Sequence, residues 1–207
     1  MKQYAHGSKE FNLRAAKHRF ETYQKPLGRS CRLVRALMRW VIRKAMHIAT
    51  LNYGYAVAFL VWISELRYVL AGMMADVADE LMGLLRFLDK EDVPLHEMNY
   101  RLNMFVSKIW WLLGDGMHIL KQGYTKHVIE VLLSEPFVWV IQNKTGSLGG
   151  VDAVSMDKVL ESAVDVMRGW MKLAVAELNC EFPSFEVVQA CELNNKSPQA
   201  TLHNDSC

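Results

Sequence analysis

Apolar residues recur every three or four positions through most of this 207-residue chain, and this period limits the fold more than any other feature. The clearest example lies between residues 156 and 178, and Asp152 or Ser155 is expected to cap its start. An amphipathic pattern of this length predicts a helix that buries one side. Its apolar face comprises Met156, Val159, Leu160, Ala163, Met167, Trp170, Met171, Ala174 and Leu178.

The same period predicts helices in other parts of the chain. We expect one over 10–24, a long central helix over 53–88 with an interruption at 71–72, and one that starts at Pro94 and ends near Gly114 or Gly116 or runs on to Gly123. We also expect one over 124–140 that Pro136 would strain or interrupt. The sequence "KPLG" at 25–28 is expected to separate the first helix from a basic one that follows, and "FVWVIQ" is the best candidate strand. The sequence therefore predicts an all-α bundle of about five to seven helices.

The length suits one domain with one hydrophobic core, which we place at residues 1–194. Within it we distinguish a basic helical segment, 1–47, from an acidic and apolar helical body, 48–194. The tail, 195–207, contains one leucine and no periodic apolar face, so we expect it to be disordered.

Charge is distributed very unevenly along the chain. Residues 1–47 contain twelve Lys and Arg against two acids, a balance of +10, and the remaining residues contain twelve against twenty, a balance of −8. The two parts sum to the net charge of +2. Such asymmetry favours an anionic partner for the basic segment.

Five arginines account for much of this charge, and we call Arg29, Arg32, Arg35, Arg39 and Arg43 the arginine row. Their spacings of three and four predict one stripe about 20 Å long on a helix. No acidic residue occurs between Thr22 and Ser64 that could pair with them locally. Arginine also suits phosphate, since its planar fork can hold two oxygens.

Nucleic acid is the favoured partner, because phosphates repeat along a strand as the arginines repeat along the helix. We expect a non-enzymatic protein that binds the backbone of RNA or DNA, as a subunit of a nucleoprotein assembly. Two alternatives remain: an inhibitor or adaptor that uses the row against an acidic protein, and a row that is solvated or paired with the acidic body. The expected nucleic-acid-binding residues are the arginine row, Lys44, Arg14 and Lys17.

A membrane is a less favoured partner. The apolar core within "LNYGYAVAFLVWIS" is about eleven residues long, whereas a spanning helix needs about twenty.

Catalysis and cofactors are not expected either. Asp115 with His118, and His127 with Glu130, have the spacing seen in helical di-metal sites, which Glu65 and Glu80 could complete, but ordinary surface placement explains such pairs better. We therefore expect no metal site.

The four cysteines form no CxxC pair and no regular spacing, so they indicate neither a zinc site nor a disulfide framework. The first thirty residues lack the apolar core of a secretory signal. Both observations favour the cytoplasm.

Overall fold

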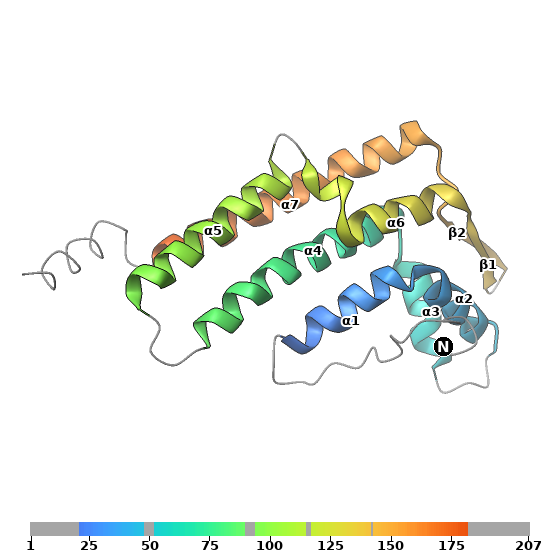
Figure 1. Cartoon of the computed structure of the whole chain (residues 1–207). Helices are drawn as coiled ribbons and strands as arrows, with labels where there is room; N and C mark the ends of the chain where they lie inside the picture. The colour runs from blue at the N-terminus through green and yellow to red at the C-terminus, as the bar shows by residue number, and fades with distance from the viewer. Residues whose placement is uncertain (1–20, 48–51, 90–93, 115–116, 142, 182–207) are drawn as a thin grey trace, which may run out of the picture.

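A computed structural model describes residues 21–47, 52–89, 94–114, 117–141 and 143–181. The described part is all-α, with one short hairpin as its only sheet (Figure 1). Its elements in order are α1 (Glu21–Arg32), α2 (Val34–Ala45), α3 (Tyr53–Trp62), α4 (Glu65–Leu88), α5 (Leu95–Leu113), a 3-10 helix (His118–Lys121), α6 (Gly123–Ser134), β1 (Phe137–Ile141), β2 (Lys144–Leu148) and α7 (Ala153–Glu181). The tail and the proposed boundary at 194 lie outside the described residues.

Helix α4 is the centre of the bundle. It packs against α1, α5, α6 and α7, while α2, α3 and the hairpin lie together at one end (Figure 1). Its buried side includes Val69, Met73 and Val77, which join one hydrophobic core that extends from Cys31 to Met171. Both the basic and the acidic parts of the chain therefore contribute to the same core.

The two clearest sequence predictions are confirmed by α5 and α7. Helix α7 extends a few residues beyond the predicted ends, and Asp152 caps it by accepting bonds from the Ser155 amide at 3.0 Å and the Ser155 hydroxyl at 2.7 Å. These two bonds lower the pKa of the Asp152 carboxyl.

The prediction of one central helix over 53–88 was wrong. The chain turns at Ile63 and Ser64, both extended, so that α3 and α4 meet at 97°. The Ser64 hydroxyl then accepts from the Arg67 amide at 3.4 Å, as an N-cap does, whereas residues 71–72 continue the helix.

The predicted helix over 124–140 is interrupted at Pro136, and residues 135–140 are not helical. Helix α6 ends at Ser134, because Pro136 holds Glu135 in an extended conformation. The aromatic and β-branched residues that follow form β1, as the candidate strand suggested, with Phe137 and Trp139 buried and Val138 and Val140 exposed.

Pro26 does not separate two helices, contrary to our prediction, because it lies inside α1. The buried side of α1 packs on α4 and α6, which stabilises the helix despite the proline. Gly28 allows this approach, since a Cβ atom there would lie 2.7 Å from Tyr124 Cζ. The predicted helix over 10–24 lies mostly outside the described residues.

Cys31 is expected to resist thiol reagents in the folded protein. Burial raises the pKa of its thiol to about 12, so almost no thiolate forms near neutral pH. After brief exposure to a maleimide at pH 7.5, peptide mass mapping should find Cys180, which is exposed, labelled and Cys31 unlabelled. Both should react in denaturant. Equal labelling in the folded protein would contradict the burial of Cys31.

Candidate functional site

The arginine row spans two helices rather than one. Arg29 and Arg32 belong to α1, and Arg35, Arg39 and Arg43 belong to α2. The helical hydrogen bonding continues across the break at Leu33, whose amide donates to the Arg29 carbonyl at 2.9 Å and whose carbonyl accepts from the Leu37 amide at 2.7 Å. The stripe is therefore kinked but continuous along the backbone.

Most of the row faces solvent. Arg32, Arg35, Arg39 and Arg43 are exposed, whereas Arg29 and Lys44 are half-buried. The opposite side of α2 packs into the core through Val34, Met38, Val41 and Ala45. Helix α2 is therefore amphipathic, with arginines on its exposed side and apolar residues on its buried side. Arg14 and Lys17 lie outside the described residues.

One carboxylate from the body reaches two members of the row. Glu135 Oε1 lies 3.6 Å from Arg35 Nε and 3.4 Å from Arg39 Nη2, and Arg35 also donates to the Ser134 hydroxyl at 2.9 Å. More than half of each arginine side chain remains accessible to solvent. One negative charge shared by two positive charges leaves an excess of one.

Arg32 is placed differently, because it packs on the body. Its guanidinium lies 4.9 Å from the centre of the Tyr124 ring, and its charge favours the ionised form of Asp79. Its carbonyl oxygen is 3.2 Å from His127 Nε2. The pKa of Asp79 is nevertheless raised, since burial outweighs the hydrogen bond from Tyr124 and the nearby arginines.

A buried contact beside Arg32 holds the bundle together. The Asp76 carboxylate on α4 accepts bonds from the Tyr124 amide at 2.8 Å, the Thr125 amide at 2.9 Å and the Thr125 hydroxyl at 2.6 Å. It thereby caps α6 from another helix. Gly123 precedes these residues with φ +68°, and a Cβ there would collide with Asp76.

The residues considered for a metal site are not brought together. His118 stacks on Trp111 with ring centres 4.3 Å apart, and the Glu65 carboxylate accepts from the Gly149 amide at 3.0 Å. Glu80 lies 3.8 Å from Lys108, and Asp115 is outside the described residues. Within the described ranges no three His, Cys, Asp or Glu side chains are grouped so that they could hold a metal ion.

Two contacts of the site were missed by sequence reasoning. Along the chain, Glu135 lies 96 residues from Arg39, and Asp76 lies 49 residues from Thr125. Local sequence patterns do not predict contacts between residues so far apart in the chain. Asp79 likewise meets α1 only through the packing of α1 on α4.

The chain matches no protein-family model, no curated protein sequence and no solved structure.

Proposed function

We propose that this chain is a non-enzymatic, cytoplasmic protein that binds the backbone of nucleic acid through the arginine row, as part of a nucleoprotein assembly. The observation that carries the proposal is the shared carboxylate: Arg35 and Arg39 are more than half exposed and have Glu135 between them. Arg43 continues the exposed stripe one turn further along α2. Arg35 and Arg39 therefore carry one more positive charge than the carboxylate between them, and both charges are in contact with solvent.

The contacts to Glu135 are weak enough to be exchanged. Exposed ion pairs contribute only about 0.2–1 kcal/mol, and these two have N–O distances of 3.6 and 3.4 Å. A phosphate offers two or more acceptor oxygens to each guanidinium fork, and its binding also releases condensed counterions. Phosphate can thus replace Glu135 without disturbing the core.

The backbone is the expected target rather than base edges. Arg35, Arg39 and Arg43 rise about 6 Å per step, close to the rise of about 6.8 Å along the duplex axis that separates every second phosphate of one strand. The sequence contains none of the common motifs that read bases. We therefore expect affinity that depends strongly on salt and weakly on base sequence.

Copurification tests this function against the rival acidic-protein partner. Protein purified at low salt should carry nucleic acid, measured as excess absorbance at 260 nm, and should lose it after a high-salt wash. Added oligonucleotide should then rebind at low salt. Failure to bind oligonucleotide, together with retention of an acidic protein, would favour the rival.

Glu135→Gln is expected to strengthen oligonucleotide binding by about three- to tenfold, because it removes the anion that competes for Arg35 and Arg39. Fluorescence anisotropy at constant salt measures the change. Glu161→Gln is the matched control, since Glu161 is an exposed acid on α7. An equal gain in both variants would show an effect of net charge alone, and no gain would show that Glu135 does not compete.

A further inference from the structure

One face of helix α3 is apolar and exposed to solvent. Its sequence, YGYAVAFLVW, contains no charged residue. Ala56 and Leu60 are buried in the core, but the other side exposes 82% of Tyr55, 80% of Val61 and 54% of Trp62. A helix that is apolar all round is normally covered on all sides. A contiguous exposed apolar face is typical of an interaction surface.

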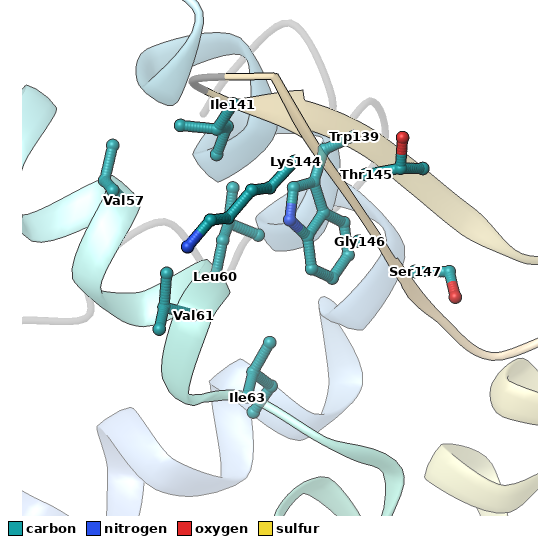
Figure 2. A pocket seen from close by; sticks show the side chains of 10 residues that line it. All are labelled: Val57, Leu60, Val61, Ile63, Trp139, Ile141, Lys144, Thr145, Gly146 and Ser147. Carbon is teal, nitrogen blue, oxygen red and sulfur yellow. The ribbon is translucent and has the colours of Figure 1, made fainter.

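The edge of this face is positively charged. The Arg67 guanidinium lies 4.8 Å from the centre of the Trp62 ring and donates to the Trp62 carbonyl. On the other side, Lys144 extends its amine toward Val57 and Val61 along a groove between α3 and the hairpin (Figure 2). We call the exposed side of α3 with Arg67 and Lys144 the α3 patch.

Little negative charge accompanies these cations. Glu65 is the only acidic residue between positions 22 and 75, and its carboxylate is half-buried and bonded to the Gly149 amide at 3.0 Å. The α3 patch therefore combines an apolar centre with a basic rim, and its occupant should be apolar and anionic.

A second copy of the chain fits this patch poorly. Helix α3 has ten residues and is about 15 Å long, whereas a stable dimer buries about 800 Å² on each partner. A two-fold contact would also bring the cations of both rims together, and like charges repel.

We propose that the α3 patch docks onto the surface of an anionic lipid bilayer. Tyr55 and Trp62 have the amphipathic rings that favour the headgroup level, Val61 would enter the acyl boundary, and Arg67 and Lys144 would meet anionic headgroups. Within the described residues no single helix is long and apolar enough to cross a bilayer, and α3 meets α4 at 97°. In this docking, α3 lies along the membrane surface. This binding is separate from the proposed nucleic-acid function.

Vesicle sedimentation with the full chain tests the proposal, after nuclease treatment and a high-salt wash. The vesicles contain phosphatidylcholine alone, or phosphatidylcholine with about one third phosphatidylserine. The parent chain should bind the anionic vesicles, and Tyr55→Ser/Val61→Ser should lower that affinity at least about tenfold. Val166→Ser/Leu173→Ser is the matched control, because it removes exposed apolar side chains from α7, and it should bind as the parent does.

A charge variant and two further readouts complete the test. Arg67→Gln/Lys144→Gln should reduce the preference for anionic over neutral vesicles, while the oligonucleotide affinity of the Tyr55→Ser/Val61→Ser variant should match that of the parent. No vesicle binding by the parent, or equal binding by the Tyr55→Ser/Val61→Ser variant, would overturn the proposal. The proposal would also be overturned if the parent formed dimers that the Tyr55→Ser/Val61→Ser variant did not form, since the patch would then bind a second copy. It would equally be overturned if this variant bound oligonucleotide more weakly than the parent, since the patch would then stack on bases. Circular dichroism confirms that each variant is folded.

Discussion

Replacing Arg35, Arg39 and Arg43 together by Gln is expected to lower oligonucleotide affinity on the order of 100-fold near physiological salt, because three phosphate contacts are lost. The slope of log affinity against log salt should flatten by about 2 to 3 units. Helicity should not change, since all three side chains are exposed and Gln has a helix propensity close to that of Arg. Anisotropy titrations at several salt concentrations measure both quantities.

A control with the same loss of charge separates the row from net charge. Lys121→Gln/Lys158→Gln/Lys172→Gln removes three exposed cations elsewhere on the molecule, and its affinity should stay within a few-fold of the parent. Equal losses in the two triple variants would refute a localised site. Arg32 is left unchanged in the test because it packs on Tyr124, so its loss would also affect stability.

Asp76→Ala is expected to lower the free energy of unfolding by about 2–4 kcal/mol, the largest stability effect that we predict. The change removes three hydrogen bonds at the start of α6 and leaves the donors of the fully buried Thr125 without their acceptor. Urea denaturation followed by circular dichroism measures the loss. Asp165→Ala, at an exposed position of α7, should change stability by less than about 0.5 kcal/mol.

The effect of Asp76→Ala should also depend on pH. Burial raises the folded-state pKa of Asp76 above its ordinary value of 3.8, despite its hydrogen bonds with Thr125 and Tyr124. The stability that this group contributes is therefore complete below pH 3.8 and falls as the pH rises through the raised pKa. The difference between parent and variant should be larger at pH 4 than at pH 7. A larger difference at pH 7 would mean that the hydrogen bonds outweigh burial.

The spacing of apolar residues was sufficient to predict the long amphipathic helices, but it did not predict where the chain turns. Helices α5 and α7 follow from their apolar spacing alone. The break between α3 and α4 carried a weaker local signal, an N-cap Ser64 followed by Glu65, within an apolar run that reads as one helix. In β1, the preference of Val, Trp and Ile for strands competed with helical spacing, and Pro136 decided between them.

The arginine row of the candidate site was predictable from the sequence, but the residues that contact it were not. The spacing of the arginine row predicted its exposed stripe, because steps of three and four return to one helix face. The contact of the row with Glu135 could not be predicted, because Glu135 is distant in the sequence and the contact depends on how α2 packs against the end of α6. The exposed face of α3 could not be predicted from the sequence either. A helix without charged residues is expected to be buried, and only the packed fold shows which of its sides remains exposed.

The salt dependence of oligonucleotide binding by the parent chain tests the central claim most directly. With about five phosphate contacts, the slope of log affinity against log salt should be roughly −3.5 for a single strand and −4.5 for a duplex. Oligonucleotides of different base composition but equal length should give nearly the same affinity and slope. An absence of binding at low salt, or a slope close to zero, would contradict the assignment of the arginine row to the nucleic-acid backbone.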